Sequence, residues 1–205
     1  MKDTQALVRK CRGARILLFL AVVAVIPIEG FGQNPDPLSV TGKLRYHAES
    51  VYSPWSIAGT AAYAGGLQAF NSPEEWGQGA EAYGKRFAST MAWAGVYHTL
   101  AFGLDATLHE DPRYFPSGDK GFWRRTGHAL RLTILTRTDR GGETLSVWRL
   151  GSAYGSAFLS DEWYPDRFHT VKYGLIYGTV TVGFGFAANL GKEFWPDVKR
   201  KVFHK

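Results

Sequence analysis

The chain of 205 residues contains a single cysteine, Cys11, and only two methionines. One cysteine cannot form an intrachain disulfide, and a metal site built from several thiolates is excluded. The sequence also lacks a Gly-x-Ser-x-Gly elbow, a phosphate-binding loop, a His-Glu-x-x-His pair and a dinucleotide-binding fingerprint. Function therefore has to be argued from less specific patterns.

The first 32 residues have the organisation of a secretory signal. A basic head precedes an uncharged run over residues 16–28, and Gly30 and Gly32 supply the small residues expected before a cleavage site. The run is shorter than the roughly 20 apolar residues of a permanent membrane span. We therefore predict cleavage after Gly32 and an exported protein, located in the periplasm or in the cell-envelope membrane.

The formal charge of +6 overstates the basicity of the mature chain. The predicted leader holds five of the 24 basic and two of the 18 acidic residues, so 19 and 16 remain, a net charge of +3. A charge this small does not indicate a nucleic-acid partner. The remaining 173 residues fit one domain, and neither a cofactor nor a metal is predicted.

Prolines, glycines and polar residues divide the mature chain into segments. Residues 33–53, which include Pro35 and Pro37, are predicted to be a polar linker. Residues 54–198 form the predicted helical domain, and residues 199–205 form a basic tail. Within the domain, helical segments are expected over Trp55–Phe70, Glu74–His109, Phe122–Thr136, Glu143–Ser160 and Val171–Gly191, with a loop over residues 113–120 and a turn over residues 139–142.

Small residues recur four positions apart along these segments. This spacing places them on one helix face and lets helix backbones approach closely, as in membrane helices. We accordingly expect Gly95, Gly103, Gly174 and Gly178 to lie at helix contacts. The segments Phe87–Leu108 and Tyr173–Gly191 have few or no charges, and each could reach across about 30 Å.

These patterns predict a mainly α fold, a glycine-rich bundle of about four or five helices associated with a membrane. The alternative is an outer-membrane β-barrel, because Tyr173–Ala187 also alternates and is rich in β-branched and aromatic residues. Both faces of that segment are apolar, however, whereas the strands of a barrel alternate apolar with polar positions. The helical prediction is therefore preferred.

Acidic and aromatic residues gather at the ends of three small-residue segments. Trp and Tyr beside charges at the end of an apolar run are typical of residues anchored at a membrane interface. Ordinary turns packed on a core would have the same composition. The three clusters are Pro73–Trp76, Asp161–Asp166 and Lys192–Asp197.

His98, Asp105 and His109 fall within about 20° of one stripe of a helix. With His128 they are the weak candidates for acid–base chemistry in the chain. Asp105 and His109 lie one turn apart, but two side chains do not make a metal site. The alternative is that these groups bond to neighbouring helices.

Arg124, His128 and Arg131 form a basic stripe, which we predict to lie opposite an apolar stripe of Trp123, Leu130 and Ile134. A basic amphipathic helix suits an anionic lipid surface or headgroup. The alternative is an ordinary solvated face.

Five blocks spread over most of residues 54–198 resemble an uncharacterised family of exported bacterial envelope proteins. This resemblance implies no activity, ligand or catalytic residue. The blocks are Glu75–Gly79, Tyr83–Arg86, Glu110–Tyr114, Phe122–Arg125 and Lys192–Asp197.

Taken together, the patterns favour a structural or interaction role at a membrane over catalysis. The expected partner is membrane lipid or another envelope protein, with a homo-oligomer as a further possibility. The rival hypothesis is a small membrane-associated hydrolase, acting on phosphoesters or assisted by a metal, that uses His98, Asp105, His109 and His128. A compact cluster of at least three of these around one cavity would favour the hydrolase.

Overall fold

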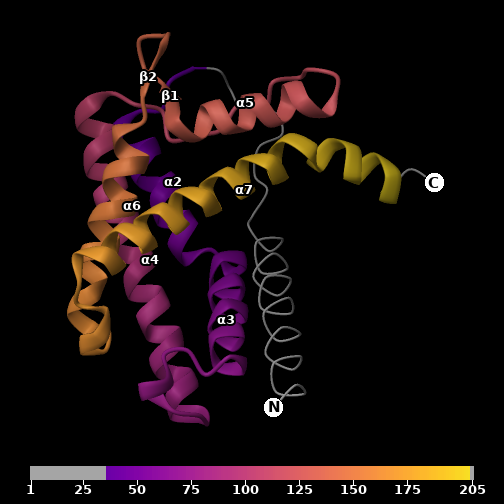
Figure 1. The fold of residues 1–205 in the computed structure, drawn as a ribbon. Coiled ribbons are helices and arrows are strands. Elements are labelled where there is room, and N and C mark those ends of the chain that lie inside the picture. Colours follow the sequence, from indigo (N-terminus) through magenta and orange to yellow (C-terminus); the bar gives the residue numbers. More distant parts are fainter. Residues whose placement is uncertain (1–35, 204–205) are drawn as a thin grey trace.

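The computed structural model describes residues 36–203. The predicted signal peptide lies outside the described residues. The described part is mainly helical, as expected, with six α-helices and one small sheet (Figure 1). The helices are α2 (Val40–Tyr52), α3 (Pro54–Ala69), α4 (Ala80–Leu108), α5 (Phe122–Ile134), α6 (Val147–Ser160) and α7 (Val171–Phe203), joined by short 3-10 turns η1 (Glu74–Trp76), η2 (Asp161–Trp163) and η3 (Asp166–Phe168).

Two short strands, β1 (Leu135–Arg137) and β2 (Glu143–Leu145), pair antiparallel between α5 and α6, with Thr136 opposite Thr144. The sequence had assigned Leu135, Thr136 and Glu143–Leu145 to the ends of helical segments. Tyr173–Ala187, for which a strand was the alternative, lies within α7. Helix α7 also continues to Phe203, so most of the predicted basic tail is helical.

The prediction of a polar linker over residues 33–53 is wrong for Val40–Tyr52, which form α2. Ser39 starts this helix, because its hydroxyl accepts a hydrogen bond from the Gly42 amide at 3.1 Å. Ser53 ends α2 and starts α3 in the same way, with Pro54 at the first helical position. Lys43, a polar residue, is among the most deeply buried of α2, which is why a search for an apolar face misses the helix.

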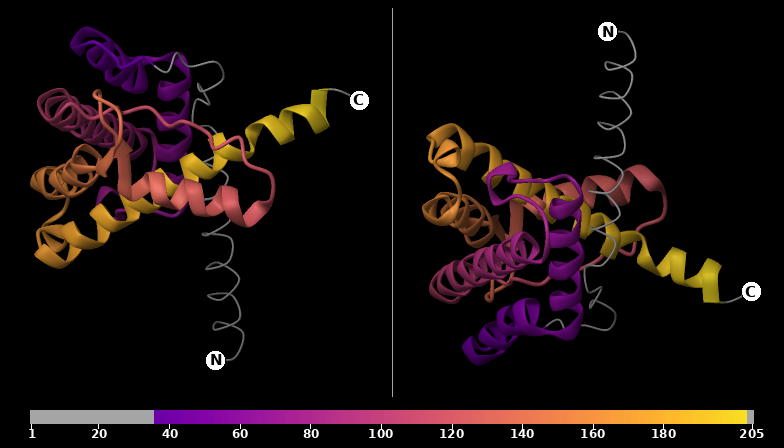
Figure 2. Two further views of the ribbon diagram at one scale, coloured as in Figure 1. Left: turned by 90° about the horizontal axis from the view of Figure 1, so that it is seen from above. Right: turned by 90° about the horizontal axis from the view of Figure 1, so that it is seen from below.

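The helices pack in a chain of neighbours rather than around one central axis. Helix α4 contacts α2, α3 and α6, α6 contacts α7, and α5 lies across the carboxyl-terminal part of α7 (Figures 1 and 2). Among helices in residues 36–203, none combines the length and apolar character needed to cross a membrane.

The interior of the described part is unusually polar. Its buried apolar side chains are mostly alanines, and the largest fully buried side chains are those of Arg86, Lys43, Glu110 and Glu193. Many large apolar side chains are exposed instead, among them Trp123 and Trp55. Buried charges need partners, so the contacts of these groups position the helices.

Glycines allow close contact between α6 and its neighbours. A Cβ on Gly151 or Gly155 would lie within 3.0 Å of a leucine of α4, and a Cβ on Gly174 or Gly178 would overlap an aromatic ring of α6. The prediction of a helix contact is thus confirmed for Gly174 and Gly178.

The same prediction is wrong for Gly95 and Gly103 of α4, where a Cβ would meet nothing within 4 Å. The spacing of small residues marks a face on which close approach is possible. It does not decide whether a neighbouring helix uses that face.

Candidate functional site

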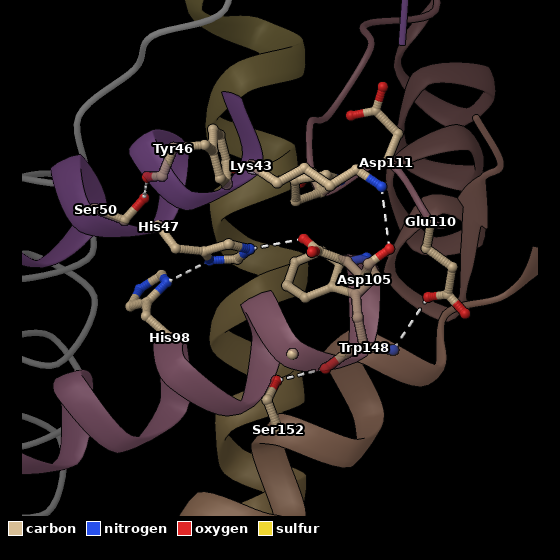
Figure 3. Close-up of polar contacts among 12 residues, drawn as sticks. Lys43, Tyr46, His47, Ser50, His98, Asp105, Glu110, Asp111, Trp148 and Ser152 are labelled. Atoms are coloured by element: carbon tan, nitrogen blue, oxygen red, sulfur yellow. Dashed lines mark hydrogen bonds and ion pairs between the residues drawn. The ribbon is translucent and has the colours of Figure 1, made fainter. Parts of the chain in front are cut away.

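Three polar side chains, two of them buried and His98 partly buried, form a relay between α2 and α4 (Figure 3). Nε2 of His47 lies 2.7 Å from Oδ2 of Asp105, and Nδ1 of His47 lies 2.9 Å from Nδ1 of His98. His47 and Asp105 are almost completely buried. His98 lies two helical turns from Asp105 on α4, and His47 of α2 bridges the gap.

The hydrogen bonds fix where protons can lie in this relay. An ionised carboxylate only accepts, so Asp105 requires the proton on Nε2 of His47. When both rings are neutral, Nδ1 of His47 then accepts from Nδ1–H of His98, which leaves Nε2 of His98 without a proton. One proton lies between the two Nδ1 atoms, and the separation leaves no room for two.

The burial of the relay shifts its titration. Burial and the neighbouring His47 lower the pKa of His98 from 6.5 to about 3. Burial also raises the pKa of Asp105 from its ordinary value, and the hydrogen bond from His47 together with the charge of Lys43 opposes that change. At neutral pH, His98 is therefore an uncharged imidazole.

Lys43 connects the relay to the β1–β2 turn. Its buried ammonium donates to the backbone oxygen of Asp105 at 3.0 Å and to Oδ2 of Asp139 at 2.7 Å. The same oxygen of Asp139 lies 3.8 Å from Nδ1 of His109, an exposed residue at the end of α4. His109 thus adjoins the relay through Asp139 and does not enter it.

Two further buried charges, Glu110 and Arg149, both contact Trp148. Glu110 accepts hydrogen bonds from the backbone amides of Val147 at 3.3 Å and Trp148 at 3.1 Å, and so caps the first turn of α6. The buried guanidinium of Arg149 donates to backbone oxygens of α5, and burial lowers its pKa. These contacts hold α6 in place.

The amino-terminal end of α5 is joined to the carboxyl-terminal part of α7 by ion pairs and by aromatic contacts. Arg125 pairs with Asp197, lies 3.6 Å from Glu193, and stacks on the ring of Phe194. The Phe122 ring lies 5.5 Å from that of Phe194, centroid to centroid. The Lys192–Asp197 cluster is therefore a helix contact.

The other two acidic-aromatic clusters, Pro73–Trp76 and Asp161–Asp166, meet near the amino-terminal end of α4. Arg167 pairs with Glu74 and Glu75, and the rings of Trp76 and Tyr164 lie 5.2 Å apart. These aromatic rings are only partly exposed. They pack against one another, as the alternative of ordinary turns predicts.

The apolar stripe and the basic stripe of α5 do not lie where the sequence predicted them. The buried face consists of Ala129, Leu132 and Thr133, so the apolar stripe faces outward: Trp123 is 80% exposed, Leu130 53% and Ile134 40%.

The basic stripe of α5 lies beside the apolar stripe and not opposite it, because Arg124 follows Trp123 by only about 100° of rotation. Arg124 is exposed, and Arg131 is exposed and pairs with Glu143. His128 turns away to the backbone oxygen of Phe115 at 3.0 Å.

The four acid–base candidates do not form one cluster. His98 and Asp105 share the relay, His109 adjoins it, and His128 lies on α5. Within residues 36–203, no three His, Cys, Asp or Glu side chains are grouped so that they could hold a metal ion. The sequence reasoning missed His47, Lys43 and Asp139, although Lys43, His47 and Val51 follow one another at helical spacing.

Comparison of the chain with protein-family models, with curated proteins and with solved structures found no match.

Proposed function

We propose that this chain is an exported cell-envelope protein with an interaction role, which binds anionic membrane surfaces through α5 and the end of α7. The observation that carries the proposal is the exposed apolar stripe of Trp123, Leu130 and Ile134 beside the exposed Arg124. A protein rarely leaves such a stripe exposed without a use for it. The hydrolase hypothesis stays a prediction.

The composition of this surface suits the boundary between headgroups and acyl chains. Tryptophan favours that boundary because its ring is apolar and its N–H is polar. A helix that lies in the interface buries its apolar side by a few ångströms, while flanking arginines reach the phosphates. Helix α5 offers both kinds of side chain on one exposed side.

The end of α7 adds positive charge next to α5. Lys199, Arg200 and Lys201 are exposed, and they follow Asp197, which pairs with Arg125 of α5. The two basic segments of the sequence are therefore neighbours. Each Lys or Arg near an anionic bilayer is worth about 1 kcal/mol, and salt weakens that attraction.

The charge contribution can be measured by co-sedimentation with liposomes. The double variant Arg124→Ala with Arg131→Ala is expected to bind vesicles of phosphatidylcholine and phosphatidylserine roughly 30-fold more weakly, which corresponds to about 2 kcal/mol. The difference should shrink as salt rises. Trp123→Ala should weaken binding at every salt concentration, because its contribution is apolar.

A matched control removes the same charge elsewhere. Arg45 of α2 and Lys172 at the start of α7 are exposed and belong neither to α5 nor to the end of α7, so Arg45→Ala with Lys172→Ala should leave most of the binding intact. Equal losses of binding in the two double variants would show that binding depends on the net charge of the protein and not on the surface of α5. No binding by the unaltered protein, at any lipid charge, would remove the proposal.

Export has its own measurement. Protein recovered from the envelope of the producing cell should begin at Gln33, because Gly30 and Gly32 are the small pair that follows the apolar run. Amino-terminal sequencing decides this directly. Recovery of exported material that begins at Met1 would contradict the predicted cleavage.

A further inference from the structure

The contact between His47 and His98 can hold only one proton. Their Nδ1 atoms face each other at 2.9 Å, and a hydrogen bond of that length has one N–H and one lone pair. The bond survives when both rings are neutral, and it survives when one ring is charged. It fails when both rings are charged, because two N–H groups then point at each other.

We propose that the His47–His98 contact is an acid-sensitive latch that holds α2 against α4 and opens as the surroundings become mildly acidic. This inference is independent of the proposed membrane role. It rests on the position of the two rings, on the burial of His47 and the partial burial of His98, and on the polar nature of the other contacts of α2.

Few apolar contacts hold α2 in place. Val51 is its only apolar side chain that is fully buried, and its other buried residues are Lys43 and His47. Tyr46 adds a hydrogen bond to the backbone oxygen of Pro112 at 3.3 Å. The other contacts of α2 include the hydrogen bonds of Lys43 and the packing of the His47 ring against Phe102 and Trp148. Because the buried side of α2 is held mainly by polar groups, a change of charge among them affects its closure.

The charged groups around the latch do not offset the repulsion that a second proton between the two rings would cause. Within residues 36–203, Asp105 is the carboxylate that contacts either ring, and it is already bonded to His47. Lys43 is a cation on the same helix as His47, and Asp139 is bonded to it. The remaining titratable or charged groups near the relay are Tyr46 of α2, Tyr97 and His109 of α4, Glu110, Asp111 and Arg113 of the following segment, and Arg149 of α6.

Acid therefore favours the open state. A released His98 regains its ordinary pKa of 6.5, whereas in the closed state its pKa is about 3. The open state binds a proton that the closed state does not bind, so closure is fully favoured above pH 6.5 and weakens as the pH falls toward 3. From pH 7.0 to pH 5.5 this gives a roughly eightfold rise in the opening constant.

Asp105 acts in the opposite direction. Its pKa is raised in the closed state, so its own protonation favours closure and opposes the effect of His98. The part of the pH dependence that belongs to His98 is therefore the part that a variant of His98 removes.

Hydrogen exchange of the full chain tests the latch. After correction for the intrinsic rate, amides of residues 40–52 should exchange roughly eightfold faster at pH 5.5 than at pH 7.0. Amides of residues 147–160 in α6 should not change. Equal protection of α2 at the two pH values would overturn the proposal.

Two variants assign the effect to His98. His98→Gln retains a side-chain N–H that can donate to Nδ1 of His47 but does not titrate, so the pH dependence of α2 should disappear. His169→Gln, an exposed residue outside the relay, should leave the pH dependence unchanged. Retention of the full pH dependence in His98→Gln would overturn the proposal.

A measurement on the unaltered protein covers the case in which His98→Gln fails to fold. The ring resonances of His98, followed by NMR from pH 7.5 to pH 5.0, should not titrate at 6.5 while α2 remains protected. A His98 ring that titrates near 6.5 while α2 remains protected would show that the closed state accepts the proton that is expected to open it, and the latch would be excluded.

Discussion

Replacing Arg86 with methionine is expected to lower the free energy of unfolding by roughly 3 kcal/mol. The Arg86 side chain has no exposed surface, and its guanidinium donates to the backbone oxygens of Ser72 at 2.9 Å and Pro73 at 2.8 Å, and to Oε1 of Gln68 at 2.5 Å. Methionine fills a similar volume and donates nothing. Each acceptor left buried without a donor costs about 1–3 kcal/mol.

The burial of Arg86 also carries a cost, which sets the size of this effect. Burial lowers the pKa of Arg86, so the native side chain is itself strained by desolvation, and its removal returns part of the loss. For that reason we expect roughly 3 kcal/mol and not the full sum over the stranded acceptors.

The neighbouring Lys85 provides the control. It is exposed and pairs with Glu81 at 2.8 Å on the same helix, so Lys85→Met should change the stability by less than about 0.5 kcal/mol. Denaturant titration of both variants gives the comparison. Similar values for Arg86→Met and Lys85→Met would show that the buried hydrogen bonds do not determine the connection between α3 and α4.

Replacing Gly178 with leucine is expected to destabilise the protein by about 1–3 kcal/mol or more. Any Cβ at this position would overlap the ring of Tyr154, which is held by a hydrogen bond between its hydroxyl and Oγ1 of Thr179 at 3.0 Å. The ring or the helix must move, and the close contact between α6 and α7 is lost. Thermal and denaturant unfolding measure the change.

Gly183 of the same helix makes the matched comparison. A Cβ there meets nothing within 4 Å, and leucine has a higher helix propensity than glycine by up to about 1 kcal/mol. Gly183→Leu should therefore be neutral or slightly stabilising. If both leucine variants were tolerated equally, α6 and α7 would not be packed as closely as the glycines indicate.

Much of the secondary structure could be predicted because its signals are local. Pro54 starts α3, and Pro112 excludes a helix through the residue before it, so α4 ends shortly before it, at Leu108 with His109 as its cap. The turn at Asp139–Gly142 and the start of α7 at Val171 were also expected. In each case, the residues that decide the structure lie within a few positions of the boundary.

Helix α2 could not be predicted from apolar periodicity. Its buried side carries Lys43 and His47, which a hydrophobic pattern counts as exposed. Those two residues are buried because Asp105 and Asp139 meet them, and both partners come from distant parts of the chain. A buried charge is acceptable only where its partner is present.

The sequence by itself determined a helical, glycine-rich chain, the positions of most helices, and the stripe of arginines on α5. Only the tertiary structure decided which side of α5 is exposed, which glycines contact a neighbour, and that His47 joins His98 and Asp105. The relay connects positions 51 and 58 residues apart. Helix signals act over a few residues of backbone, whereas the partner of a side chain depends on how whole helices pack, and no short stretch of sequence contains that information.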